Sequence, residues 1–248
     1  EPARPRHQPG QRLRAGRRRA GSVASMPRRA LVIATGASVE EVGRVARADD
    51  LVIGADGGVD VVLAAGLHPA LVVGDLDSAS ASALARADAA GARVDRRPPD
   101  KDESDLELAL AAAVAAGAPA VHAVLADGGR LDHQLANLLV LASARWSAAT
   151  VTATVGRASL WVVRDHLALP LPVGAAGALQ AVGAPADGVR TTGLRFPLRG
   201  ERLEPLAARG IANEVVARLA TVEVEGGVVL VVSSEPGRPD RAQPDQAV

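Results

Sequence analysis

Residues 51–65 read LVIGADGGVDVVLAA, and this stretch decides the fold. The apolar run Leu51–Gly54 has the length of a buried strand, and Gly58–Ala65 is rich in the small and aliphatic residues typical of a helix. Between them lies Ala55-Asp56-Gly57, a turn-forming tripeptide. A buried strand that leads at once into a helix is half of a βαβ unit, so the stretch predicts a parallel sheet.

The same alternation continues on both sides of this stretch, from residue 30 to about residue 147. We predict further strands at Ala30–Thr35, Leu71–Gly74, Arg93–Asp95 and Ala120–Leu125. We predict further helices at Ser38–Ala48, Ser80–Ala90, Asp102–Ala116 and Leu131–Arg145, the first opened by a Ser38–Glu41 capping box. The expected architecture is therefore a doubly wound parallel sheet, in which ligands bind at the carboxyl ends of the strands.

From about residue 149 the sequence becomes typical of an all-β region. Runs rich in Val and Thr are separated by Gly, Pro and Asp, at 151–155, 159–163, 177–182, 188–192, 214–225 and 228–232. This pattern predicts a β-sandwich. We expect four regions: a disordered basic leader (1–27), an α/β domain (28–148), a β-sandwich domain (149–233) and a disordered tail (234–248).

The net charge of zero hides an uneven distribution. The first 25 residues carry seven arginines and one glutamate, which leaves 21 basic and 27 acidic residues in the rest of the 248-residue chain. An acidic body argues against nucleic acid as a partner. Without an apolar run long enough for a signal peptide or a membrane span, we also expect no membrane partner. The lack of cysteine excludes disulfides and thiolate metal sites and suits a cytoplasmic location.

Met26, the only methionine, stands just before the first predicted strand. We expect translation to start there, with the preceding residues as an upstream extension. The alternative is a genuine basic arm.

Acidic or glycine-rich motifs follow four of the predicted strands. They are 54–58 (GADGG), 74–78 (GDLDS), 100–105 (DKDESD) and 127–133 (DGGRLDH). Parallel strands bring such loops to one edge of the sheet. Carboxylates such as Asp75 and Asp77 suit Mg²⁺, which binds through one or two carboxylates and substrate phosphates. A turn followed by a helix cap is the alternative explanation for this pair.

Lys101 is the only lysine among 28 basic residues, and it lies in the densest acidic cluster. Asp102 as a helix N-cap would explain one aspartate, but a cation at a helix N-terminus is mildly unfavourable. A phosphate between Lys101 and a carboxylate-bound metal would resolve this conflict. The lysine ammonium is a compact charge, whereas the arginine guanidinium found at the other basic positions of the chain is planar, so the two are not interchangeable at such a position.

Other residues near the same edge are candidates for ligand contact. The pairs Gly57-Gly58 and Gly128-Gly129 allow the backbone to approach a ligand closely. Arg130 has the geometry to bind a phosphate, and His133 is either an acid/base partner or structural. The sequence has no GxGxxG, P-loop, HExxH or GxSxG motif, so the common nucleotide fingerprints, zinc chemistry and serine hydrolysis are unsupported.

Six motifs in order resemble the thiamine pyrophosphokinase (thiamine diphosphokinase) family. They are 55–58, 74–78, 101–109, 128–133, 191–198 and 210–214, and the resemblance covers roughly residues 28–232. It implies a Rossmann-like catalytic domain that binds ATP and Mg²⁺, a β-sandwich that binds thiamine, and a homodimer with thiamine sites near the subunit interface. The implied reaction transfers a pyrophosphoryl group from ATP to the thiamine hydroxyl and releases AMP.

The resemblance also assigns roles to residues. Asp75, Asp77 and Asp105 would hold Mg²⁺, while Lys101 and Arg130 would balance charge on the triphosphate. Asp132 would orient the thiamine hydroxyl or complete the metal shell, and which aspartate serves as base is left open. The nucleotide pocket would further include Gly36, Asp56, Gly57, Gly58 and Gly129, and the thiamine site Thr192, Phe196 and Asn213.

The chain departs from the family pattern at four positions, one of which is Gln180, in a stretch that is normally more apolar. Ser104 stands in place of a threonine, Phe196 in place of a tryptophan or tyrosine, and Ala212 in place of a serine. Two alternatives remain: a diphosphokinase for another acceptor, such as a pterin, and a binding protein that senses thiamine or nucleotide. The motifs after residue 149 argue against the first, and the full set of acidic residues argues against the second.

Overall fold

The computed structural model describes residues 28–234. The predicted leader (1–27), and the predicted tail apart from Ser234, lie outside the described residues. No helix in the described part combines the length and the apolar character needed to cross a bilayer.

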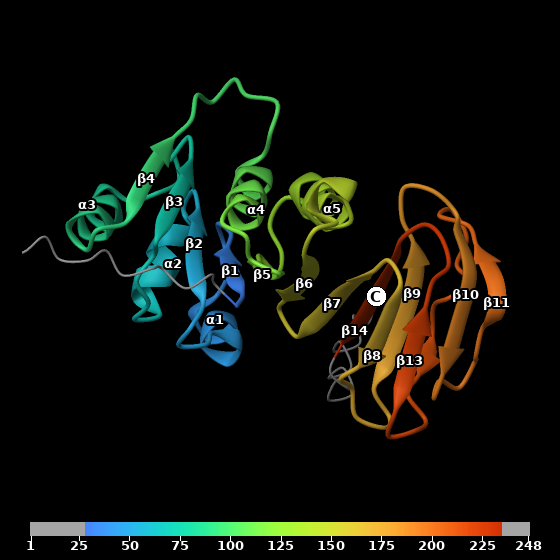
Figure 1. The fold of residues 1–248 in the computed structure, drawn as a ribbon. Coiled ribbons are helices and arrows are strands. Elements are labelled where there is room, and N and C mark those ends of the chain that lie inside the picture. Colours follow the sequence, from blue (N-terminus) through green and yellow to red (C-terminus); the bar gives the residue numbers. More distant parts are fainter. Residues whose placement is uncertain (1–27, 235–248) are drawn as a thin grey trace, which may run out of the picture.

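A ten-stranded sheet runs through the whole described chain, in the order β12-β9-β14-β7-β6-β5-β1-β2-β3-β4 (Figure 1). Its parallel part confirms the predicted strand–helix alternation. That part consists of β1 (Ala30–Ile33), β2 (Leu51–Ala55), β3 (Leu71–Gly74), β4 (Arg93–Arg96), β5 (Ala120–Leu125) and β6 (Thr150–Val155). The chain runs from β1 through β2 and β3 to β4, then returns to the other side of β1 for β5 and β6. The strand order therefore reverses between β1 and β5.

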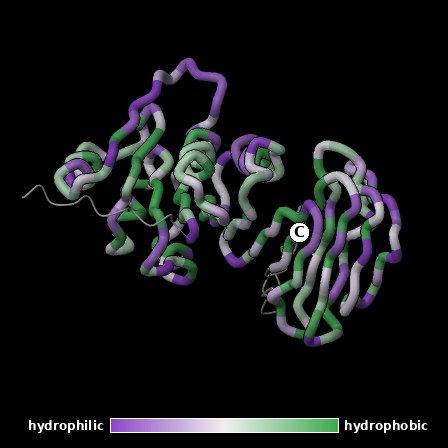
Figure 2. The backbone as a smooth tube through the Cα atoms, viewed as in Figure 1, coloured by the Kyte–Doolittle hydropathy of each residue, from purple (hydrophilic) through white to green (hydrophobic). Residues whose placement is uncertain are grey.

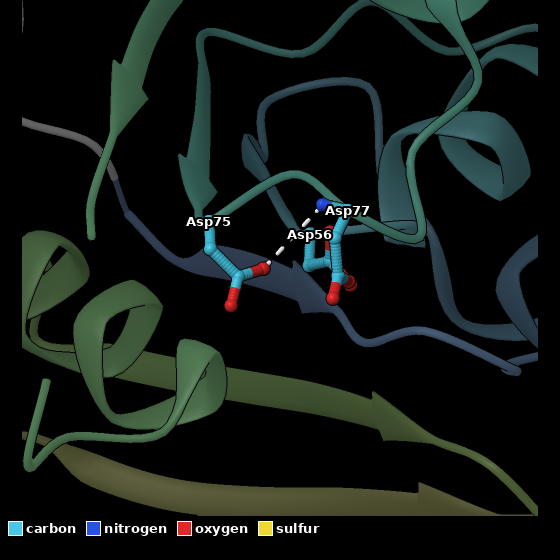
Figure 3. A group of neighbouring side chains, drawn as sticks. All are labelled: Asp56, Asp75 and Asp77. Carbon is cyan, nitrogen blue, oxygen red and sulfur yellow. Dashed lines mark hydrogen bonds between the residues drawn. The ribbon is translucent and has the colours of Figure 1, made fainter. Parts of the chain in front are cut away.

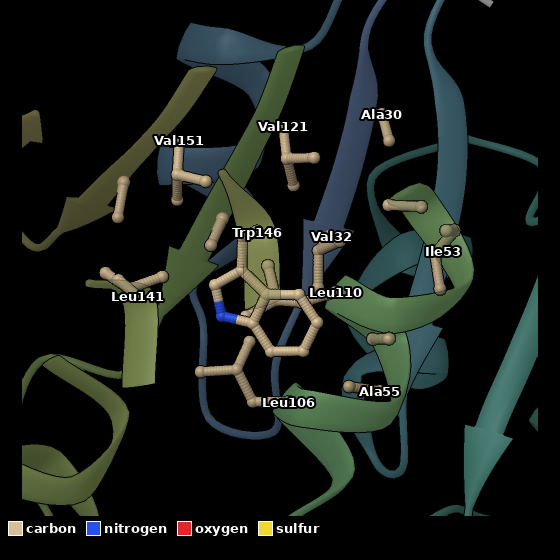
Figure 4. Close-up of a cluster of buried hydrophobic side chains, with 14 of the residues drawn as sticks. Ala30, Val32, Ile53, Ala55, Leu106, Leu110, Val121, Leu141, Trp146 and Val151 are labelled. Atoms are coloured by element: carbon tan, nitrogen blue, oxygen red, sulfur yellow. The ribbon is translucent and has the colours of Figure 1, made fainter. Parts of the chain in front are cut away.

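Helices cover both faces of the parallel part, because successive apolar side chains of each strand point to opposite faces of the sheet. Leu31 and Ile33 pack toward α1 (Val39–Val45) and α2 (Gly58–Ala64). Val32 points the other way, into a core with α4 (Asp105–Ala115) and Trp146 (Figure 4). The remaining helices are α3 (Ala81–Ala89), α5 (Leu131–Leu141) and the 3₁₀ turn Ala144–Trp146.

The antiparallel part of the large sheet packs against a second sheet of four strands. It contains β7 (Ala158–Val163), β9 (Ala176–Ala181), β12 (Asn213–Glu214) and β14 (Val229–Ser234). The second sheet is antiparallel, in the order β11 (Arg199–Leu203), β10 (Ala186–Thr192), β13 (Ala220–Glu223) and β8 (His166–Leu169). An apolar core that includes Leu179, Val189 and Val222 lies between the two. Hydrophobic and hydrophilic residues are interspersed along the strands of this region (Figure 2).

Some predicted elements were wrong in extent. The predicted strand at 214–225 is broken into β12 and β13. The short strands β8 and β11 were missed, and both lie at edges of the four-stranded sheet. The predicted helix at 131–145 ends at Leu141 and is followed by the separate 3₁₀ turn.

Two capping boxes fix the starts of helices. The predicted Ser38–Glu41 box is confirmed, with the Glu41 backbone N–H donating to Ser38 Oγ at 3.1 Å. At α4 the N-cap is Ser104, whose backbone N–H donates to Glu107 Oε2 at 3.0 Å. The predicted start at Asp102 was therefore wrong, because this second box places Asp105 at the first helical position.

His122 on β5 is held in its neutral form. Its Nδ1 and Nε2 lie 2.8 and 3.0 Å from the hydroxyl oxygens of Thr152 and Thr154. Burial, together with the charges of Arg29 and Arg47 and against the opposing charge of Asp50, lowers its pKa to about 4. The Arg29 guanidinium donates two hydrogen bonds to the Asp50 carboxylate, at 2.6 and 2.7 Å. This buried ion pair holds the positive charge of Arg29 in place near His122.

We predict a pH-dependent stability that originates at His122. Because its folded pKa is below the unfolded value of 6.5, its contribution is complete above pH 6.5 and is lost as the pH falls toward 4. The loss would reach about 3 kcal/mol at most. Urea unfolding between pH 7.5 and pH 4.5 should show a smaller pH dependence in His122→Gln than in wild type. Exposed His68, changed to Gln, is the control, and an equal pH dependence in His122→Gln would contradict the assignment.

Candidate functional site

A cavity of about 780 Å³ opens where the parallel strands end. Its lining comes from the carboxyl ends of β1, β2, β3, β5 and β6, from the first turn of α4 and from the first two turns of α5. The reversal of strand order between β1 and β5 lies within it. Where the strand order reverses, the connections on its two sides diverge and leave a crevice at the carboxyl ends of the strands. The position of the cavity therefore agrees with the sequence prediction.

Three carboxylates meet at one side of the cavity. Asp56, Asp75 and Asp77 each offer an oxygen, and these oxygens lie within 4.8 Å of one another (Figure 3). Asp56 is buried; its two oxygens accept bonds from Thr35 Oγ1 at 3.2 Å and from the Ser78 backbone N–H at 3.3 Å. The sequence predicted Asp56 as part of a nucleotide pocket, whereas the structure places it among the carboxylates.

Two unusual backbone conformations position this cluster. Asp56 has φ 48° and Leu76 has φ 63°, both in the left-handed region. Such conformations cost roughly 1–3 kcal/mol each in side chains other than glycine and persist only where the surroundings enforce them. Leu76 is enforced by burial of its side chain against α2 and α3. The strain therefore lies in the two loops that carry the carboxylates.

Lys101 and Asp105 adjoin the cluster. The Lys101 ammonium lies 3.1 Å from Asp105 Oδ1 and 3.4 Å from Asp75 Oδ2. Asp105 packs against the backbone of Gly74, where a Cβ would lie 2.8 Å from Oδ1. This oxygen is buried and, apart from its ion pair with Lys101, forms no hydrogen bond within residues 28–234. The cavity thus contains a carboxylate oxygen whose bonding capacity is not used.

The pKa shifts at this pair reflect burial and opposite charge. Burial raises the pKa of Asp105, with further raising by Asp75 and Asp56, and the bond to Lys101 only partly opposes this. Burial disfavours the charged form of Lys101, but hydrogen bonds and charge from Asp105 and Asp75 outweigh it and raise its pKa. The ammonium therefore stays charged at neutral pH.

Four carboxylates share this site with one ammonium. A divalent cation bound through oxygens fits the donor set and the excess of negative charge. Of the three predicted metal ligands, Asp75 and Asp77 lie together, and Asp105 lies beside Asp75 with Lys101 between them.

The predicted glycines divide into two groups. Gly36, Gly128 and Gly129 line the cavity with positive φ, as expected for backbone near a ligand. Gly57 and Gly58 do not line it. A Cβ at Gly58 would overlap the Ile33 carbonyl oxygen, so this glycine serves the close packing of α2 on β1.

The start of α5 carries a charged pair. Arg130 donates from Nε and Nη2 to the two Asp132 oxygens at 3.1 and 2.5 Å. The bond from Arg130 is the main cause that lowers the pKa of Asp132 to about 2. Arg130 and His133 line the cavity, and Asp132 lies outside the lining. The geometry therefore makes Asp132 an orienting partner of Arg130.

The predicted thiamine residues lie in the antiparallel region, outside the cavity lining. Asn213 is buried; its Oδ1 accepts from the Phe196 and Glu214 backbone N–H groups, and its Nδ2 donates to the Phe196 carbonyl, all at 2.9–3.0 Å. This clamp leaves the Phe196 side chain 60% exposed. Thr192 Oγ1 lies 2.8 Å from Thr221 Oγ1.

Comparison with known proteins gives one family and several structures. Residues 42–153 match the family model described as the catalytic domain of thiamin pyrophosphokinase. Thiamine pyrophosphokinase from Bacillus subtilis is 20% identical, with a TM-score of 0.73 over 84% of this chain and 100% of that chain. A thiamin pyrophosphokinase family protein from Enterococcus faecalis is 24% identical, with a TM-score of 0.70 over 84% and 100%. Thiamin pyrophosphokinase from Candida albicans is 14% identical, with a TM-score of 0.69 over 84% and 90%. No curated protein sequence matches. At these identities the structures establish a shared fold.

Proposed function

We propose that this chain, whose residues 42–153 belong to the thiamin pyrophosphokinase catalytic-domain family, transfers a pyrophosphoryl group from ATP to the thiamine hydroxyl. The products are thiamine diphosphate and AMP. The match of 42–153 confirms the family predicted from the motifs. The observation that carries the proposal is the meeting of four carboxylates and Lys101 in the cavity at the strand ends.

The proposed metal is Mg²⁺, held by Asp75 and Asp77 with Asp56 or Asp105 completing the site. When bound, it would neutralise negative charge on the phosphate oxygens. Arg130 lines the cavity, and the Lys101 ammonium lies beside it, next to the lining residues Asp75 and Asp105, so both offer donors for phosphate oxygens. Their task is positioning and charge stabilisation, which account for most of the catalysis in such transfers. Asp132 acts on the reaction through the orientation of Arg130.

We assign the two parts of the chain different tasks. The parallel, Rossmann-like region at 28–148 binds ATP, and the β-sandwich region at 149–233 binds thiamine, with Phe196 as the stacking side chain. Asn213 positions Phe196 through its backbone bonds. A cytoplasmic location and the absence of nucleic-acid and membrane partners complete the proposal.

A homodimer is proposed because Phe196 and the cavity are on different parts of one chain. Leu131, Leu135 and Leu139 recur every four residues on α5 and are 77%, 56% and 50% exposed. Phe196 also leaves an apolar surface exposed, in the loop after β10. Apolar surfaces of this kind mark interfaces between chains. A second copy that covers α5 with its Phe196 region would complete the site.

We predict that Leu135→Glu weakens this dimer. A charge on the exposed leucine stripe would be buried at the interface, so light scattering should detect monomer at concentrations where wild type is dimeric. Activity should fall with the loss of the partner. Leu206→Glu is the control, since Leu206 is a fully exposed leucine in another segment, the connection between β11 and β12. A monomeric wild type, or an unaffected variant, would contradict the proposed interface.

The reaction itself is tested with ATP, Mg²⁺ and thiamine, followed by chromatography of the products. We expect equal amounts of AMP and thiamine diphosphate. Failure to form AMP with saturating substrates would contradict the proposed function, and AMP formed only with a pterin alcohol would establish the other acceptor. Thiamine binding without turnover would identify a sensing protein.

A further inference from the structure

The cavity has a second side whose chemistry differs from the carboxylate side. It is formed by the ends of β5 and β6 and the inner face of α5, with the apolar side chains of Leu125, Val155 and Leu138. In the sheet order these strands lie beyond β1 from β2 and β3, which carry the carboxylates. With about 4.8 Å between strands, the two sides are roughly 10–15 Å apart. The cavity is thus charged at one end and apolar at the other.

Helix α5 leaves room for a ligand beneath it. Within α5, only Leu141 at its end is buried, while Leu138 and Asn137 are half-buried along the cavity. The leucine stripe of the same helix faces away from the cavity lining. The inner face of α5 therefore forms one wall of a slot, and Leu125 and Val155 form the opposite side.

Two amide side chains from α5 line this slot, and only one of them is anchored. Gln134 Nε2 donates to the Gly128 carbonyl at 3.0 Å. The Asn137 side chain forms no hydrogen bond to any described residue, although it offers a donor and an acceptor side by side. A ligand that supplies an acceptor and a donor would complete the hydrogen bonding of this half-buried amide, and these bonds would contribute to its affinity.

We propose that this slot binds the nucleobase of the donor nucleotide and that Asn137 selects adenine. The inference rests on the proposed function, because it takes the phosphates to lie at the carboxylate side. Adenine presents an exocyclic amine next to a ring nitrogen acceptor, and a carboxamide pairs with both at once. On the corresponding edge guanine presents two acceptors, a carbonyl oxygen and a ring nitrogen, so a carboxamide with one donor and one acceptor cannot pair with both in either orientation.

The test compares ATP with inorganic tripolyphosphate, which has the phosphates but no base. By isothermal titration calorimetry in the presence of Mg²⁺, Asn137→Ala should weaken ATP binding roughly 10- to 100-fold. Tripolyphosphate binding should change less than about twofold, because phosphate contacts are made elsewhere in the cavity. Wild type should bind ATP more tightly than GTP, and Asn137→Asp should lose this preference, since a carboxylate has no N–H to donate to the adenine ring nitrogen. Ala136→Asn, an exposed position outside the cavity lining, is the control and should bind both ligands as wild type does.

The outcomes separate the two proposals. ATP binding no tighter than tripolyphosphate in wild type would overturn the slot and keep the phosphate site. Equal losses for both ligands in Asn137→Ala, or no loss for either, would also overturn the slot. Weaker thiamine binding with unchanged ATP affinity would assign the slot to the acceptor instead. A wild type that binds neither ATP nor tripolyphosphate would overturn the proposed function and the slot with it.

Discussion

Asp77→Asn should reduce turnover about a hundred- to a thousandfold, the size expected for loss of a group that stabilises transition-state charge. The folded state should be as stable as wild type or slightly more so. Asp77 is exposed, and its carboxylate lies 3.0 Å from the Ser78 hydroxyl and close to the carboxylates of Asp56 and Asp75. Asparagine has the same shape and keeps one oxygen, but it removes a like charge from the cluster.

A loss of activity with retained stability is what separates a functional carboxylate from a structural one. Thermal unfolding and calorimetric Mg²⁺ binding should be measured beside turnover, and Mg²⁺ affinity should fall with activity. Asp88→Asn, at an exposed aspartate on α3, is the matched control and should leave all three unchanged. Lower melting temperature, or Mg²⁺ affinity equal to wild type, would contradict the metal role given to Asp77.

The position of the site was predictable because it follows from the strand–helix alternation. Once the apolar runs at 30–35, 51–54 and 71–74 are taken as parallel strands, their carboxyl ends must lie at one edge. The loops with Asp56, Asp75 and Lys101 are then neighbours whatever their side chains do. The structure confirms the strands and helices of this region, with shifts of a few residues at their ends.

Side-chain direction was not predictable in the same way. Asp56 joins the carboxylates because it takes φ 48°, and no local sequence signal distinguishes this from an ordinary turn. Gly58 reads as a ligand-binding glycine, but it is needed for contact with the Ile33 backbone, a neighbour distant in sequence. Helix α5 deviates furthest: its leucine stripe would predict a core-facing side, yet it is exposed while Asn137 lines the cavity. The cavity on one side of α5 and the partner surface that we propose on the other account for this departure from the usual pattern of burial.

Lys101→Ala should lower turnover by about two to three orders of magnitude, since a preorganised charge that meets phosphate oxygens contributes several kcal/mol. Lys101→Arg should restore little of this activity. The ammonium is nearly buried and lies between Asp75 and Asp105, where a planar guanidinium on a different stem cannot present its charge in the same place. Arg97→Ala is the control, because Arg97 is in the same connection and pairs only at the surface with Asp95. Activity of Lys101→Ala close to that of wild type would refute this role.

The same substitution tests whether Lys101 also stabilises the cluster before substrate binds. Without the ammonium, the Asp105 carboxylate remains buried against Gly74 and near Asp56 and Asp75, with no cation beside it. We therefore expect Lys101→Ala to have a lower melting temperature at pH 7.5 and a deficit that shrinks as the pH is lowered, because burial raises the pKa of Asp105 and the bond that opposes this is gone. Mg²⁺ should restore stability without restoring turnover, because a metal can balance the carboxylates but cannot replace a phosphate donor. If Mg²⁺ restored both, Lys101 would be only a counter-ion of the cluster.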